Sequence, residues 1–139
     1  MCKFYSAIVM KNGDLIHDVN LTSHEDIIDL YGINDNGRDN FVRVEYSPKD
    51  NNDLPDINKY ILKVDESVTP KWFDEHREYV ASRLRDIVSK RIITSDRKLL
   101  TGGLYVVKDC CIDKIKYAVV VYMQNSQVNV MWENSQVNV

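Results

Sequence analysis

Apolar and polar positions alternate in short blocks along the first part of the chain, which is the pattern of paired strands. An aromatic and β-branched run, Phe4–Met10, is followed by Lys11-Asn12-Gly13-Asp14 and then by a second apolar run, Leu15–Val19. Asn-Gly between two such runs predicts a β-hairpin with a type I′ turn, because that turn requires positive φ at both central residues. Further on, Phe41–Tyr46 and Tyr60–Val64 predict two more strands, joined by a long polar loop.

The first predicted helix lies between these strands. Ser23 is a suitable N-cap, Asp26 falls at the third helical position, and Gly32 is a natural stop about ten residues on. The expected apolar stripe consists of Ile27, Ile28, Tyr31 and Leu30.

The second predicted helix begins with Thr69 as its cap and Pro70 at its first position, and it runs to about Arg91. Its apolar positions recur at spacings of three and four, which indicates one buried face. The main members of that face are Phe73, Val80, Leu84, Ile87 and Val88. Thr101-Gly102-Gly103 lacks the motif of a phosphate loop, and we interpret it as a bend into the last sheet.

A tandem repeat ends the chain. Residues 122–130 read YMQNSQVNV and residues 131–139 read MWENSQVNV, so six consecutive residues recur with a period of nine. Such periodicity is typical of stacked repeat architectures. Tracing the period backwards aligns four pairs that would each point into a shared interior, namely Cys110/Ile112, Val119/Val121, Val128/Val130 and Val137/Val139. Corners are expected near Gln124-Asn125 and Glu133-Asn134.

The fold class that follows is α+β: an N-terminal antiparallel sheet with two helices over residues 1–100, then a short nonapeptide-repeat β-solenoid or strand stack over residues 101–139. One alternative is a plain antiparallel strand pair that closes the N-terminal sheet, and another is an aggregation-prone segment of steric-zipper type. An end rung with an open edge predicts a homo-oligomer through Val128, Val130, Val137 and Val139. A further alternative is that the natural chain continues with more copies of the repeat.

Composition narrows the classes of function. The chain has 139 residues, 44% hydrophobic and 28% charged, which is ordinary for a globular protein. A net charge of −3 argues against duplex nucleic acid as a partner, and no apolar run is long enough to span a membrane. The N-terminus does not have the pattern of a signal peptide, so we expect a cytoplasmic location. Cys2, Cys110 and Cys111 have neither disulfide nor zinc spacing and are interpreted as small buried hydrophobes.

Candidate chemistry is sparse. None of His17, His24 and His76 lies in a catalytic or metal-binding motif, so we predict no catalytic residue, no metal and no cofactor. Aromatic and arginine side chains are the commonest interface anchors, which points to Arg43, Trp72 and Trp132 as binding residues. Arg with an aromatic ring can also clamp a nucleotide. Alternatively, Trp72 packs back onto the sheet.

The tail NSQVNVMWENSQVNV, together with LTSHEDIIDLYG and FVRVEYSP upstream, resembles uncharacterised phage- and prophage-encoded proteins of low-GC bacteria that carry tandem SQV-type C-terminal repeats. The resemblance implies a small accessory protein of a mobile element, in the cytoplasm of the bacterial host. Many such proteins bind and block a host component, including defence proteins and their nucleotide signals. We therefore expect a non-catalytic, self-associating binding protein that blocks a host protein. The alternative is a nucleotide-signal sponge or a nucleotide-processing enzyme.

Overall fold

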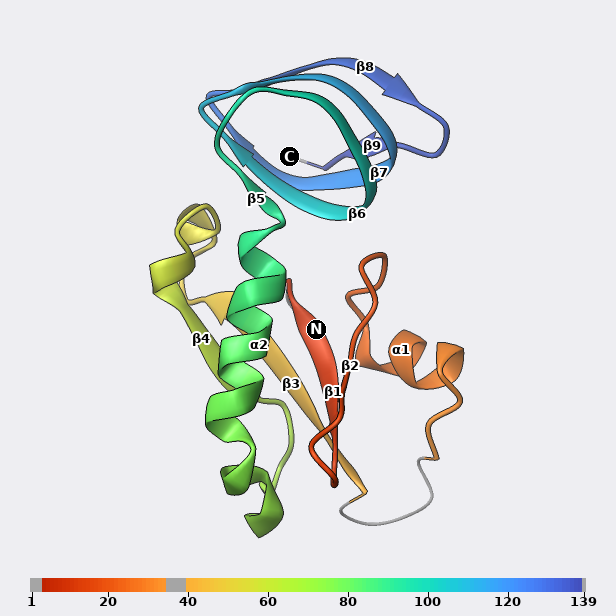
Figure 1. Cartoon of the computed structure of the whole chain (residues 1–139), viewed down its shortest axis with the longest axis vertical. Helices are drawn as coiled ribbons and strands as arrows, with labels where there is room; N and C mark the ends of the chain where they lie inside the picture. The colour runs from red at the N-terminus through yellow and green to blue at the C-terminus, as the bar shows by residue number, and fades with distance from the viewer. Residues whose placement is uncertain (1–3, 35–39, 139) are drawn as a thin grey trace.

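Two β-sheets follow one another along the chain in the computed structural model, which describes residues 4–34 and 40–138 (Figure 1). The first sheet is antiparallel with strand order β2-β1-β3-β4, and the second is parallel with the order β5-β6-β7-β8, where β9 also pairs with β7. With its two α-helices, the fold is α+β, as predicted. Cys2 and Val139 lie outside the described residues.

The predicted first hairpin is confirmed, but its turn type is wrong. Strands β1 (Ser6–Met10) and β2 (Leu15–Ile16) pair antiparallel, with Val9 opposite Leu15. Of the two central residues, Gly13 alone has positive φ, at 95°. The Asn12 side chain instead accepts a hydrogen bond from the Asp14 backbone N–H at 3.0 Å. This side-chain bond holds a three-residue loop, which needs only one left-handed position.

The second predicted hairpin is also present. Strand β3 (Phe41–Pro48) pairs antiparallel with β4 (Tyr60–Val64), and the loop between them contains two 3₁₀ turns, η1 (Asn51–Asp53) and η2 (Ile57–Lys59). Helix α1 (His24–Leu30) begins after Ser23, whose side chain accepts from the Asp26 backbone N–H at 3.4 Å. Its stripe is narrower than predicted, because Ile27 and Ile28 are buried while Leu30 and Tyr31 are exposed.

The predicted long helix is divided in two. A 3₁₀ turn, η3 (Lys71–Glu75), precedes helix α2 (Arg77–Ser89). Thr69 does not serve as the cap: Pro70 holds that position without a side-chain hydrogen bond, and the first turn closes through i→i+3 bonds such as Phe73 N–H to Pro70 O at 3.1 Å. The predicted buried face is correct, since four of its members are fully buried: Phe73, Val80, Leu84 and Val88.

The C-terminal strands are parallel, so the antiparallel closing of the N-terminal sheet is wrong. These strands are β5 (Ile92–Ile93), β6 (Arg97–Lys108), β7 (Cys111–Gln124), β8 (Gln127–Trp132) and β9 (Gln136–Val137). Figure 1 shows β6 and β7 curving along similar paths, with β8 beside the first part of β7 and β9 beside its second part. The predicted domain boundary at residue 100 falls inside β6.

The nine-residue stacking register is wrong. Val128 lies opposite Ile112, sixteen residues earlier, and Val137 lies opposite Val120. The repeat instead follows the corners: residues with left-handed φ occur at Asp109, Tyr117, Asn125 and Glu133-Asn134, roughly every eight residues. One repeat therefore spans a strand and one corner, and two repeats are needed to bring the chain back beside itself. Val120, not the predicted pair Val119 and Val121, belongs to the buried interior.

Three apolar clusters hold the fold. The first lies between α2 and the antiparallel sheet, the second lies within the parallel sheet, and the third lies between α1 and the other face of the antiparallel sheet. Val106, Val121 and Tyr122 of the parallel sheet pack into the first cluster. The Leu104 backbone N–H also donates to Val19 O at 3.0 Å, so the parallel sheet is joined to the segment after β2 by a backbone bond as well as by a shared core. Within the described residues, no helix has the length and apolar character needed to cross a membrane.

Candidate interaction surface

The predicted anchor Trp132 is the last residue of β8, and its side chain is 48% exposed. The Nζ atom of Lys114 lies 3.5 Å from the centroid of its ring. A cation over an indole face is attracted by the ring quadrupole, which favours this orientation of the ring. Lys114 lies in β7, so this contact depends on the pairing of β7 with β8, where Lys116 is the register partner of Trp132.

Exposed apolar side chains gather around this tryptophan. Of the ten large hydrophobic residues exposed in the described part of the chain, five lie on or next to the paired strands β6, β7 and β8. Met131 lies in the same register row as the buried Leu100 and Ile115, so it faces the interior side of the sheet. We call the other four the Trp132 patch: Leu99, Tyr117, Val130 and Trp132. Leu99, Lys114 and Val130 are consecutive register partners across the three strands, which places Leu99 and Val130 in one row. A gathered apolar patch of this kind marks an interaction site more often than scattered exposed residues do.

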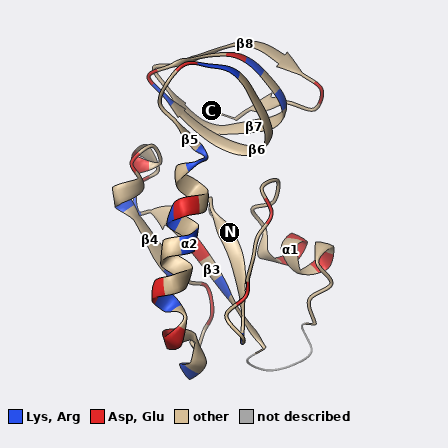
Figure 2. Cartoon of the chain, viewed as in Figure 1, with Lys and Arg blue, Asp and Glu red and all other residues tan. Residues whose placement is uncertain are grey.

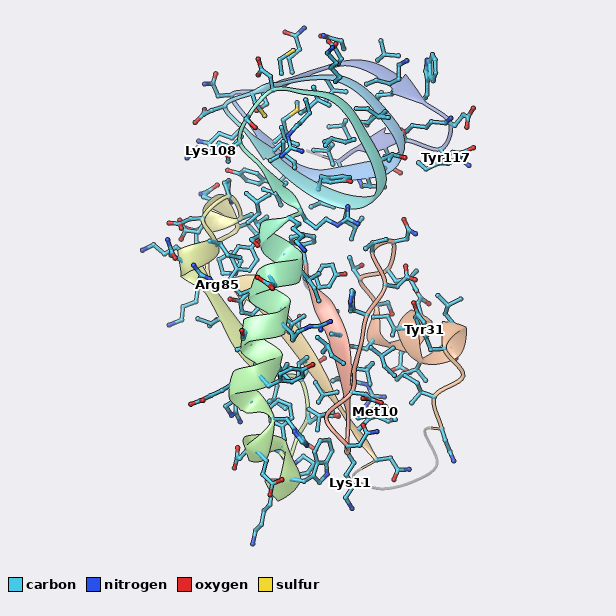
Figure 3. The ribbon with its side chains drawn as sticks, in the orientation of Figure 1. Met10, Lys11, Tyr31, Arg85, Lys108 and Tyr117 are labelled. Atoms are coloured by element: carbon cyan, nitrogen blue, oxygen red, sulfur yellow. The ribbon has the colours of Figure 1, made fainter. Side chains whose placement is uncertain are left out.

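Charged groups border the patch. Lys116 Nζ lies 3.8 Å from Glu133 Oε2 and 5.6 Å from the centroid of the Tyr117 ring. A hydrogen bond with Glu133 raises the pKa of Tyr117. Figure 3 shows Tyr117 at the end of the parallel-sheet region that lies away from Lys108. The surface is thus aromatic and apolar, with lysine ammonium groups beside it.

The interior of the parallel sheet is open at its last strand. Leu100, Ile115 and Met131 are register partners on β6, β7 and β8, and their exposures are 3%, 0% and 56%. The first two are covered by the next strand, whereas nothing among the described residues covers Met131. Val128 and Val137, two of the predicted oligomerisation residues, are only partly buried against the same core.

The predicted binding residue Arg43 forms ion pairs with two glutamates of the same chain. Its guanidinium Nη2 lies 3.0 Å from Glu25 Oε1 of α1, and Nη1 lies 3.2 Å from Glu66 Oε1, after β4. The guanidinium also lies 5.2 Å from the centroid of the Phe41 ring. These contacts tie α1 and the end of β4 to β3.

Trp72 is half-buried against the first cluster, with its ring 6.3 Å from that of Phe73. This packing corresponds to the alternative in which Trp72 packs back onto the sheet. Arg43 pairs in register with Ile8, which belongs to the third cluster on the opposite face. Arg43 and Trp72 therefore do not form one clamp, and Trp132 lies in the other sheet.

The histidines make structural contacts that the sequence did not indicate. His24 is buried, with Nε2 2.8 Å from Val44 O and Nδ1 3.5 Å from Asp65 Oδ2. His76 Nε2 lies 3.1 Å from Lys11 O. His17 Nδ1 lies 2.9 Å from the hydroxyl of the buried Tyr5. Burial raises the pKa of Tyr5 to about 12, so its hydroxyl stays neutral at physiological pH.

The two described cysteines differ in exposure. Cys110 is buried, its thiol donates to Ile93 O at 3.7 Å, and burial raises its pKa. Cys111 is partly exposed, at the rim of an open polar depression of about 410 Å³. That depression is lined by Asp96, Asp109, Cys110, Cys111, Asn125, Ser126 and Gln127. Among the described residues, no three His, Cys, Asp or Glu side chains are grouped to hold a metal ion.

The contact between buried Tyr5 and partly buried His17 predicts a pH-dependent stability. Burial, and then the nearby Arg83, lower the pKa of His17 below its ordinary value of about 6.5. Below that value the unfolded chain binds a proton that folded His17 resists, so the free energy of unfolding should fall as pH drops from about 7 to about 5. Urea unfolding of the wild type and His17→Gln across this range checks it. An identical pH dependence in both proteins would contradict the assignment.

No protein-family model, no curated protein and no solved structure matches this chain.

Proposed function

We propose that the protein is a binding module that acts by stoichiometric contact with a partner protein through the Trp132 patch. The observation that carries this proposal is that Trp132, in contact with Lys114, lies in one sheet with three other exposed large apolar side chains, Leu99, Tyr117 and Val130. Tryptophan and tyrosine are the residues most often found at the energetic centre of protein interfaces. The lysines beside the patch favour a partner surface that is apolar at its centre and acidic at its rim.

The parallel sheet serves this function as a short β-solenoid. Its support is the recurring offset of about one circuit between register partners, together with left-handed corner residues at regular intervals. In such a structure each circuit rests on the one before it, so the outer face is a rigid platform. A rigid platform loses little conformational entropy when a partner binds.

The resemblance to repeat-tailed phage and prophage proteins indicates the kind of partner. In this proposal the protein acts in the cytoplasm of a bacterial host, assembles through its C-terminal repeats and blocks a host protein, with the host's defence proteins as the first candidates. A protein that blocks its partner by covering it needs a binding surface and no reactive group. The contacts of Arg43 and His24 lie within the fold, in agreement with structural roles for both residues. A nucleotide ligand stays the alternative prediction.

The test uses Trp132→Ala with Tyr79→Ala as the matched control, because Tyr79 is a similarly exposed aromatic residue on α2, away from the patch. A partner isolated from host extract and then purified should bind the wild type at a fixed ratio. Trp132→Ala should weaken that affinity by about 2 kcal/mol or more, roughly thirtyfold, while Tyr79→Ala should leave it unchanged. Calorimetric titration of the purified pair measures both.

Two results would contradict the proposal. One is a partner whose affinity is equally insensitive to both substitutions, which would place the interface elsewhere. The other is multiple-turnover conversion of a nucleotide by the purified chain, followed by chromatography, which would make the protein an enzyme.

A further inference from the structure

The C-terminal edge of the parallel sheet combines an open core with an unpaired backbone. Met131 stands at the end of the buried row Leu100–Ile115 and is 56% exposed. Among the described residues, β8 and β9 pair with β7 only, so their other edge presents backbone N–H and C=O groups to solvent. Exposed apolar ends and exposed strand edges both favour the addition of another chain.

This edge also lacks the features by which proteins usually prevent strand addition. Residues 127–132 of β8 and 136–137 of β9 include no charged residue and no proline, and Figure 2 shows β8 free of the charges that β7 carries. Several of its exposed side chains are amides: Gln127 donates to Asn129, and Gln136 donates to Asn138. Each amide offers both donors and an acceptor, so identical strands can face each other without opposing like charges.

The opposite edge of the sheet is different. On β6, Val106 and Val107 already pair with β5, and the Leu104 N–H donates to Val19 O of the N-terminal region. The rest of that edge begins with the basic residues Arg97 and Lys98. Head-to-tail stacking would place the apolar, uncharged end of one copy against this partly occupied and basic edge, which offers Met131 no matching surface.

From these observations we propose that the occupant of the C-terminal edge is a second copy of this chain, whose β8 adds antiparallel to the first about a twofold axis. This inference rests on the self-association in the proposed function and gives it a geometry. An isologous contact uses the same edge on both copies, so assembly closes at two. Met131, Val128 and Val137 of each copy are then covered by the other. The outer faces become continuous, which puts two Trp132 patches on one particle and allows bivalent binding.

Sedimentation velocity of the full chain over about a hundredfold range of concentration measures the assembly. The expected result is a monomer–dimer equilibrium with no larger species. A monomer at every concentration would overturn the proposal, and so would species that grow beyond the dimer, because those indicate head-to-tail stacking.

Met131→Lys tests the surface, with Val68→Lys as the matched control, since Val68 is an exposed apolar residue before η3. A lysine at position 131 stays solvated in the monomer but would be buried in the dimer, so the dissociation constant should rise at least tenfold. Val68→Lys should leave it unchanged. Equal dissociation constants in the two variants would overturn the proposed edge. If Met131→Lys fails to fold, hydrogen exchange of the backbone amides of β8 in the wild type replaces this test. Their protection should increase with protein concentration. Exchange rates that do not depend on concentration would overturn the proposal.

These measurements separate the inference from the proposed function. A partner that binds the Trp132 patch of a protein monomeric at every concentration leaves the binding function intact and removes the dimer. Conversely, a dimer whose affinity for its partner is unchanged by Trp132→Ala would support the inference and contradict the proposed binding site.

Discussion

Gly103→Ala is expected to lower the free energy of unfolding by about 3 kcal/mol or more, the range of substitutions that combine backbone strain with a steric clash. A Cβ at this position would lie 2.7 Å from Arg91 Nη2 and 2.8 Å from both Cβ and O of Val19. Backbone φ is +91°, which alanine adopts only at a cost. At position 103 the N-terminal region packs directly against β6. The clash with Val19 could therefore be removed only if the N-terminal region moved away from β6.

Gly102→Ala is the matched control for this effect. Its φ is +71°, but a Cβ added there would meet no atom beyond its chain neighbours within 4 Å. The control should therefore lose only the conformational term, about 1 kcal/mol. Urea unfolding measures the free energy of unfolding of both variants. The difference between the two losses is the cost of the steric clash, because backbone strain is common to both. Similar losses in the two proteins would show that the close approach of Val19 to β6 does not occur in solution.

The second large effect is expected for Ile115→Ala, which should cost about 2–5 kcal/mol, the usual range for truncating a fully buried isoleucine. Ile115 is completely buried in the second cluster, between Leu100 and Met131 in its row. Ile61→Ala is the matched control, because Ile61 is 46% exposed on β4 and its truncation should cost less than about 1 kcal/mol. Thermal and urea unfolding measure both.

The same experiment reports on cooperativity. Because Val106, Val121 and Tyr122 pack into the first cluster, loss of the parallel sheet uncovers the core under α2. Far-UV and near-UV transitions of Ile115→Ala should therefore coincide at a lower midpoint. Two separate transitions, with the later one unchanged from the wild type, would show that the antiparallel sheet is stable without the C-terminal strands.

Local signals in the sequence identify most elements correctly. The buried face of α2, the cap at Ser23 and both antiparallel hairpins follow from spacing and short-range hydrogen bonds, which are visible in neighbouring residues. The turn type at Asn12-Gly13 is the exception, because the preference for Asn-Gly does not register the Asn12 side-chain bond that stabilises the observed loop.

The register of the parallel sheet cannot be deduced from the repeat. The period of nine predicts a distance between stacked residues, whereas in the fold it measures the distance between successive corners such as Asn125 and Asn134. Which residues pair across the sheet depends on how many corners separate neighbouring strands, and the spacing of the repeat does not encode that number.

In the candidate site too, residue types could be predicted from the sequence, whereas contacts between distant residues could not. Trp132 can be identified from residue type, but the Lys114 that holds its ring is eighteen positions away and becomes its neighbour only through the pairing of β7 with β8. Arg43 has the right chemistry for binding, yet the ion pairs with Glu25 and Glu66 that occupy it come from distant segments.

The shared core also affects how the protein matures during translation. Synthesis runs from the N-terminus, so the antiparallel sheet and α2 leave the ribosome before Val106, Val121 and Tyr122, which complete their core. Until then the nascent chain carries an unfinished apolar surface, and its native contacts span long sequence separations that are slow to form. The N-terminal half therefore reaches its final packing only after the ribosome has passed residue 122, and the C-terminal strands act as the last component of a core that begins at Tyr5.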